Sequence, residues 1–252
     1  MSTPRELPDS AELRALLANV DEDPNVAGLV LTGSAARQGM ATHRSDIDVY
    51  VVLRSADPAR RTTRSAAIDI PVCTLDDLRP VPGPDDPDGW WQRYSFTHTQ
   101  ILLDRTDGEL GRLVDAWGTL SGAESKLVLE TYLDGYLNYV YRSLKSHRDS
   151  RPFEAMLDAA ESLAWGLTVI FAFERRVRPY NKYLAWELGT HPLERPAWQA
   201  TALLPRLKDV LATGDAAAQR AVFRSVEEAA REVGLGGIVD GWGDELALFR
   251  ER

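Results

Sequence analysis

Residues 33–48 read GSAARQGMATHRSDID, and this stretch decides the fold of the chain. An apolar run, Val26–Thr32, leads into it, and a second apolar run, Val49–Leu53, follows it. Short apolar runs bounded by turn residues indicate strands buried in a sheet. The sequence therefore predicts a strand, a Gly-Ser turn, a polar connection and a second strand that opens with two acidic residues.

The two acidic residues are Asp46 and Asp48. Side chains on a strand alternate between its two faces, so both carboxylates point the same way and Ile47 points into the core. Two neighbouring carboxylates repel each other when both are charged, and a cation removes that cost. Mg²⁺ fits because carboxylates and substrate phosphates are its usual ligands.

A third carboxylate is expected close to this pair. Residues 65–74 predict another strand, and Asp69 lies within it between two isoleucines. Strands are depleted in Asp, and an unpaired buried charge is costly, so this position calls for a chemical reason. Together with Asp46 and Asp48 it would form a three-carboxylate site. Such a site holds two Mg²⁺ ions, which can activate a hydroxyl and stabilise a leaving oxygen in phosphoryl or nucleotidyl transfer.

The Gly-Ser turn supplies groups for a phosphate. Gly33 has no side chain, so a phosphate can approach its backbone, and Ser34 adds a hydroxyl donor. We expect residues 35–38 to begin a short helix whose free N–H groups face an anion. Arg37 and Arg44 are candidate charge partners for a triphosphate.

This arrangement resembles the signature of the DNA polymerase beta-like nucleotidyltransferase superfamily, in particular the small bacterial branch of aminoglycoside and lincosamide nucleotidyltransferases. The matching residues are Gly33, Ser34, Ser45, Asp46, Asp48 and Asp69. The resemblance implies that the Asp-x-Asp pair binds metal, that the third carboxylate binds metal or assists deprotonation, and that the Gly-Ser turn and Ser45 bind the nucleotide. One departure is Gln38, which separates Arg37 from Gly39 where many relatives have Arg followed directly by Gly.

The pattern along the rest of the chain predicts two domains and the α+β class. Residues 100–104 predict a further strand, after which helical spacing of apolar residues dominates from residue 121 onward. We therefore expect a mixed-sheet nucleotidyltransferase domain over residues 1–119. An all-helical, acceptor-binding domain is expected over residues 120–252, with its last helix over residues 238–252.

The helical half is expected to hold the acceptor, because relatives of this kind place a helical bundle against the sheet with the acceptor in the cleft between. Asp158, Glu161 and Trp165 fall at i, i+3 and i+7 and share one helix face. Glu161 is a candidate general base there, as an alternative to Asp69. Lys182 follows a helix break at Pro179 and is a candidate triphosphate ligand.

Composition narrows the classes of function. The 252-residue chain carries a net charge of -9, which argues against broad nucleic-acid binding because that needs clustered Lys and Arg. A single cysteine, Cys73, excludes an intrachain disulfide. The N-terminal residues lack the apolar run of a signal peptide, and we expect no membrane-spanning stretch and a cytoplasmic location. The oligomeric state stays open.

These observations predict an enzyme that moves a nucleoside monophosphate, AMP from ATP in the first instance, to a hydroxyl of a small molecule. The resemblance suggests an aminoglycoside or lincosamide antibiotic as the acceptor. An alternative is an antitoxin-type nucleotidyltransferase that modifies a partner protein. The long helical half of this chain argues against that alternative. A non-catalytic nucleotide-binding module is a third possibility, disfavoured by the intact set of three acidic residues.

Overall fold

The computed structural model describes residues 10–251, and these form two compact units. The first unit ends at Thr119 and contains the sheet, and the second begins at Leu120 and is largely helical. The α+β class expected from the sequence is confirmed. Residues 1–9, on which the expectation of no signal peptide rests, lie outside the described residues.

The sheet of the first unit places β1 and β2 at its centre. Its strand order is β3-β4-β2-β1-β6, and β5 pairs with β2 beyond the end of β4. β1 is antiparallel to both β2 and β6, whereas β4 and β5 run parallel to β2. The strands are β1 (Val26–Thr32), β2 (Ile47–Leu53), β3 (Thr63–Arg64), β4 (Ile68–Ile70), β5 (Val72–Thr74) and β6 (Gln100–Asp104).

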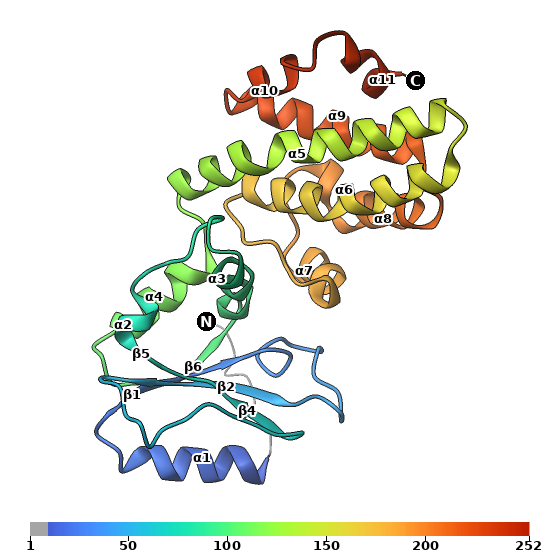
Figure 1. Ribbon diagram of the computed structural model, residues 1–252. Coiled ribbons are helices and arrows are strands. Elements are labelled where there is room, and N and C mark those ends of the chain that lie inside the picture. Colours follow the sequence, from blue (N-terminus) through green and yellow to red (C-terminus); the bar gives the residue numbers. More distant parts are fainter. Residues whose placement is uncertain (1–9, 252) are drawn as a thin grey trace. The chain divides into compact units, whose positions relative to one another are not determined.

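Helices cover both faces of this sheet (Figure 1). On one face, α1 (Ala11–Asp21) packs Leu13, Leu16 and Val20 against alternate residues of the central strands. The other face carries α2 (Leu75–Leu78), α3 (Pro87–Gln92), a 3₁₀ turn (Arg93–Phe96) and α4 (Glu109–Gly118). Because both faces are covered, β1 is buried along its whole length, which explains its continuous apolar run.

The strand expected over residues 65–74 is divided in the structure. β4 begins only at Ile68, and Pro71 separates it from β5. Proline has no N–H to donate to a neighbouring strand, so one uninterrupted strand cannot run through this position. Pro71 still contributes its carbonyl, which accepts a hydrogen bond from the N–H of Val51 at 2.9 Å. Both short strands therefore stay attached to β2.

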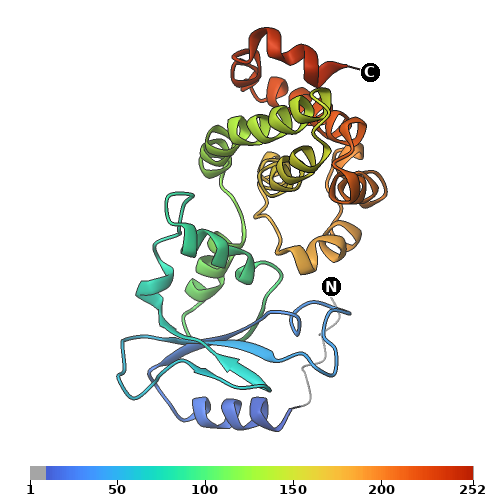
Figure 2. The ribbon, with the colours of Figure 1, turned by 45° about the vertical axis from the view of Figure 1, so that its right-hand side comes forward.

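The second unit is built on two long antiparallel helices that lie side by side (Figures 1 and 2). Their close approach uses glycine, since a Cβ on Gly135 would meet the Trp165 ring at 2.5 Å and one on Gly166 would meet the Tyr136 ring at 2.8 Å. The helices are α5 (Gly122–Arg148), α6 (Pro152–Phe173), α7 (Leu184–Thr190), α8 (Ala200–Thr213), α9 (Ala216–Glu232), α10 (Gly236–Asp240) and α11 (Leu246–Arg250), with 3₁₀ turns at Asn181–Tyr183, Pro196–Trp198 and Gly243–Glu245.

Two helical expectations differ from the structure in this unit. The helix predicted over residues 238–252 is divided into α10, a 3₁₀ turn and α11, and Gly243 between them has φ of 51°. In addition, α6 is long and apolar enough to cross a membrane by length and composition, although we expected no such stretch. Half of the most apolar 18-residue stretch of α6 is buried inside the unit. Core helices of soluble proteins can be equally long and apolar.

Candidate metal centre

Strand register brings three aspartates together. β2 and β4 run parallel with Asp48 opposite Asp69, so these two side chains are neighbours on one face of the sheet. Asp46 lies two residues before Asp48, in the segment just before β2 begins. Carboxylate oxygens of all three residues lie within 4.8 Å of one another. The structure therefore forms the three-carboxylate cluster expected from the sequence.

This cluster has the chemistry of a divalent-cation site. Its donors are all carboxylate oxygens, which suit hard cations such as Mg²⁺. None of the three side chains is fully buried, so further oxygen ligands could reach a cation held there. Three negative charges this close repel one another in the absence of a cation. The cluster is consistent with divalent-metal binding.

Gly33 places the Gly-Ser turn directly against this cluster. Its φ is 62°, in the left-handed region that favours glycine. A Cβ at this position would meet Oδ2 of Asp48 at 1.9 Å, far inside contact distance. Any other residue would displace either the turn or the carboxylate. Glycine is therefore required here both by backbone conformation and by the closeness of Asp48.

The segment after Gly33 is a pair of turns and not the short helix that we expected. The N–H of Ala36 donates to the carbonyl of Thr32 at 3.3 Å, and the N–H of Arg37 donates to the carbonyl of Ser34 at 3.1 Å. Ser34 itself is buried. One bond is i to i−4 and the other i to i−3, but they do not continue into a helical ladder and Gly33 is left-handed, so anion binding by a helix N-terminus has no basis here.

Arg37, a candidate phosphate contact in the sequence, lies inside the sheet unit. The side chain is buried, and its guanidinium donates to the carbonyls of Gly33 at 2.6 Å, Tyr94 at 3.0 Å and Thr97 at 2.8 Å. It also lies over the Tyr94 ring. These bonds tie the Gly-Ser turn to the segment that precedes β6. The structure favours Arg37 as the residue that fixes the turn beside the metal centre.

Arg44 and Ser45 lie in the exposed connection that precedes β2. The Oγ of Ser45 accepts a hydrogen bond from the N–H of Thr42 at 2.9 Å, which closes a tight turn. Both residues, together with Asp46 and with Glu12 at the start of α1, line an open cleft of about 370 Å³. Arg44 is thus an exposed cation that lines the same cleft as Asp46.

The residues singled out in the helical unit do not form a comparable cluster. Asp158 makes an ion pair with Arg142 of α5 at 3.1 Å. Glu161 is exposed on α6, and the Trp165 ring packs near the rings of Tyr132 and Tyr139. Lys182 is exposed with its Nζ 4.8 Å from the centre of the Tyr183 ring. An acceptor or phosphate role for Glu161 and Lys182 stays a prediction.

One residue beside the cluster escaped the sequence analysis. Arg64 of β3 lies opposite Asp69 in the antiparallel β3–β4 pair, and its Nε is 3.9 Å from Oδ2 of Asp69. The signal in the sequence is a basic residue five positions before an acidic one. That spacing has no meaning until the tight return between the two short strands is known.

Comparisons with known proteins found similarity only among solved structures. No protein-family model matches the chain, and no curated protein matches it. Among solved structures, the chain is similar to a nucleotidyltransferase-like protein from Exiguobacterium sibiricum 255-15, with 12% sequence identity and a TM-score of 0.46 over 95% of this chain and 79% of that chain.

Proposed function

We propose that this protein is a metal-dependent nucleotidyltransferase that moves AMP from ATP, or the corresponding group of another nucleoside triphosphate, to a hydroxyl of a small molecule. The observation that carries the proposal is the convergence of Asp46, Asp48 and Asp69 within 4.8 Å, with Gly33 against Asp48. The motif from Gly33 to Asp48 and its resemblance to the polymerase beta-like signature support the same reaction.

The reaction balances without an oxidant or reductant. The acceptor hydroxyl oxygen forms a bond to the α-phosphorus, the bond from that phosphorus to the bridging oxygen breaks, and pyrophosphate leaves. Asp46, Asp48 and Asp69 would hold the divalent ions, which would supply Lewis-acid stabilisation to the reacting oxygens. The hydroxyl proton passes to a carboxylate, for which Asp69 and Glu161 are the two candidates.

The residues of the sheet unit divide the remaining work. Asp46 and Asp48 bind the metal ions, and Gly33 lets the triphosphate approach the backbone of the turn. Ser34 and Ser45 contribute hydroxyl groups to nucleotide binding. Arg44 supplies positive charge for the phosphates, while Arg37 holds the turn in place through three backbone carbonyls.

The helical unit is proposed to bind the acceptor. Its partly exposed rings of Tyr132, Tyr139 and Trp165, with Glu161 on the same helix as Trp165, suit a substrate that combines sugar-like faces with cationic groups. Lys182 is proposed to contact the triphosphate. An aminoglycoside or lincosamide is the acceptor that the motif resemblance suggests, and small-molecule hydroxyl transfer is the broader proposal.

A transfer assay tests this function. The purified protein is incubated with α-labelled nucleoside triphosphates, Mg²⁺ and a panel of hydroxyl acceptors, and labelled product and pyrophosphate are measured. We expect transfer by the unmodified protein and by Asp115→Ala, whose carboxylate is exposed on α4. The pair Asp46→Ala and Asp48→Ala should abolish transfer. Undiminished transfer in that double variant would remove the metal centre from the mechanism.

Mass spectrometry of the same reactions separates the acceptor classes. A mass increase of one nucleoside monophosphate on the small molecule supports the proposed function. The same increase on a Tyr or Ser of a co-purified protein would instead establish the protein-modifying alternative. Nucleotide binding by calorimetry without product on any acceptor would favour a non-catalytic module.

A further inference from the structure

We propose that Arg64 competes with metal ions for Asp69. Arg64 thereby keeps the affinity of the three-aspartate cluster for free metal ions low until the nucleotide binds. This inference rests on the proposed function. Its basis is a row of side chains across the sheet, in which Arg64 lies opposite Asp69 and Asp69 lies opposite Asp48. Directly opposite residues on neighbouring strands share one face, so the arginine ends the row that holds two of the three carboxylates.

The contacts of Asp69 show how the competition works. Its Oδ1 accepts a hydrogen bond from the N–H of Ser65 at 3.3 Å, and its Oδ2 lies 3.9 Å from Nε of Arg64. The main-chain bond orients the carboxylate whether or not the arginine stays. The Asp69 carboxylate is thus shared between Arg64 and any cation that enters the cluster.

Exposure makes the Arg64 contact easy to break. The Arg64 side chain is 79% exposed, whereas the Asp69 side chain is 23% exposed. Exposed ion pairs are weak and cost little to separate. Arg64 can therefore move off Asp69 when a metal ion binds, and its positive charge remains near the centre to meet the phosphates of a nucleotide.

The charge of Arg64 has opposite effects on the binding of a free divalent cation and on the binding of a metal–nucleotide complex. Arg64 repels a divalent cation bound alone, and at these separations in water the loss of one charge should change metal affinity about three- to tenfold. The same charge attracts a triphosphate, so its loss should weaken binding of the metal–nucleotide complex. A residue that only supported the fold would change both affinities in the same direction.

A Mn²⁺ titration, in which electron paramagnetic resonance measures the bound fraction of the ion, tests this inference. Three proteins are compared, namely the unmodified chain, Arg64→Gln and Arg61→Gln. Arg61 is also exposed and precedes β3, and its Nε donates to the carbonyl of Pro58, so its loss changes the net charge equally without touching Asp69. We expect Arg64→Gln to bind free Mn²⁺ about three- to tenfold more tightly than Arg61→Gln does.

A second titration with a non-hydrolysable ATP analogue completes the test. Arg64→Gln should bind the Mn²⁺–analogue complex more weakly than Arg61→Gln, which reverses the order seen with the metal alone. Equal Mn²⁺ affinities in the two variants would overturn the role of Arg64 and leave the proposed function standing. If the unmodified protein binds no Mn²⁺, the proposed function and this inference both fail.

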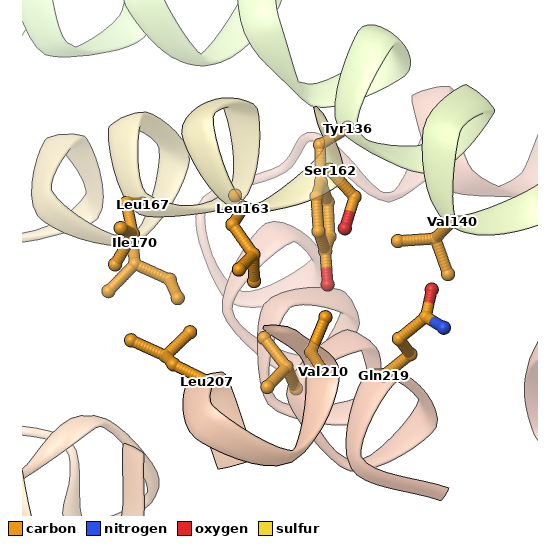
Figure 3. A pocket seen from close by; sticks show the side chains of 11 residues that line it. Tyr136, Val140, Ser162, Leu163, Leu167, Ile170, Leu207, Val210 and Gln219 are labelled. Carbon is orange, nitrogen blue, oxygen red and sulfur yellow. The ribbon is translucent and has the colours of Figure 1, made fainter. Parts of the chain in front are cut away.

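An independent observation concerns a cavity of about 10 Å³ in the core of the helical unit (Figure 3). The hydroxyl of Tyr136 points into it, and Gln219 and Ser162 contribute polar groups at the same end. Within residues 10–251, neither Oη of Tyr136 nor Oε1 of Gln219 has a hydrogen-bond partner, and both side chains are buried. The remaining walls are apolar.

We infer that this cavity binds one water molecule that links Tyr136 to Gln219. The Nε2 of Gln219 donates to Oγ of Ser143 and to the carbonyl of Gly214, both at 2.9 Å, so its Oε1 is left to accept. Burial raises the pKa of the Tyr136 phenol, which keeps its hydroxyl protonated as a donor. A volume near 10–15 Å³ with two or more polar partners is about what one buried water needs.

Nuclear magnetic resonance on the full chain tests this site. A long-lived water should give cross-relaxation to the side-chain amide of Gln219, and ¹⁷O relaxation dispersion should lose about one long-lived water in the Tyr136→Phe, Gln219→Met double variant. Tyr132→Phe, whose ring is partly exposed, is the control and should keep that water. No cross-relaxation in the unmodified protein would show that the cavity is dry and overturn the inference.

Discussion

The two units of this protein place their polar residues in different ways. In the sheet unit, Asp48 and Asp69 face each other because β2 and β4 pair in that register, and Gly33 lies against Asp48. In the helical unit, Asp158 and Glu161 share one helix face but have different environments: Asp158 pairs with Arg142, and Glu161 is exposed. Acidic residues form a cluster in one unit and stay in separate environments in the other.

This difference teaches how far a local spacing can specify chemistry. Strand alternation sets Asp46 and Asp48 on one side, and a neighbouring strand then has only a few registers in which to add a third carboxylate. A helix face sets two residues side by side, but it does not say which element covers that face. Motifs on paired strands are therefore the better guide to a catalytic centre.

The largest expected effect is on kcat, in a comparison of variants at the two candidate bases, Asp69 and Glu161. Asp69→Asn should lower kcat about 10³-fold, because metal stabilisation of the transition state contributes several kcal/mol, and it should also weaken Mn²⁺ binding. Glu161→Gln should lower kcat about 10²-fold and leave Mn²⁺ affinity unchanged, as expected for proton transfer alone. Steady-state kinetics with a Mn²⁺ titration would measure both. An unchanged kcat in Glu161→Gln would assign the proton to the sheet unit.

The next prediction tests the closeness of the turn to the carboxylates with two matched glycines. Gly33 and Gly39 both have positive φ, 62° and 78°, but a Cβ on Gly39 meets nothing within 4 Å. Alanine at either position should lower the unfolding free energy by about 1 kcal/mol through backbone strain. Only Gly33→Ala should also weaken Mn²⁺ binding, by about tenfold or more, because it displaces Asp48.

Calorimetric Mn²⁺ titrations and urea unfolding of the two alanine variants provide the measurement. Equal metal affinities in Gly33→Ala and Gly39→Ala would mean that the turn moves freely relative to Asp48. That result would contradict the rigid placement of the turn that distinguishes the sheet unit.

Substitution of two arginines of the sheet unit, Arg37 and Arg44, should affect protein stability and nucleotide binding differently. Arg37→Met should lower the unfolding free energy by about 2–4 kcal/mol, because three buried or partly buried carbonyls lose their donor. Arg44→Met should change stability by less than about 0.5 kcal/mol, since its side chain is exposed. It should instead raise KM for the nucleotide. Urea unfolding and nucleotide titrations would show whether these effects divide in this way.

The smallest effect concerns pH and the C-terminal part of the helical unit. Burial raises the pKa of Glu227, but hydrogen bonds from Arg250 and Arg231 outweigh it and hold this pKa below its ordinary value of 4.5. A lowered folded pKa stabilises the protein above the unfolded pKa, and that stability is lost as pH falls through the folded value. The contribution should be below about 1 kcal/mol because the site is partly open to solvent.

Chemical unfolding between pH 6 and pH 3 would measure this contribution. The stability difference between the unmodified protein and Glu227→Gln should shrink as pH falls below 4.5. Glu228→Gln is the control, because Glu228 is 69% exposed and lies 4.0 Å from Arg195. A difference that stays constant with pH would show that the Arg231 and Arg250 bonds do not form in solution.

Several structural details lay beyond reach of sequence patterns for identifiable reasons. The helix expected after Ser34 does not form, because Gly33 adopts a left-handed conformation and Arg37 is drawn inward to carbonyls that lie about sixty residues away in the chain. Pro71 divides a predicted strand into β4 and β5. Its carbonyl still accepts a hydrogen bond from Val51 of β2, and which strand pairs with this position is not visible in the sequence. Arg64 became a neighbour of Asp69 only through the tight return between β3 and β4.

The sequence by itself determined the α+β class, the two central strands and the presence of acidic residues on one face, because strand alternation and apolar runs are local properties of the chain. The sequence also led us to expect Asp69 beside Asp46 and Asp48, and the tertiary structure confirmed it through the pairing of β2 and β4. Only the tertiary structure decided that Arg37 turns inward and that Arg64 faces Asp69. These outcomes depend on strand register and on contacts between distant segments, and no local pattern encodes either one.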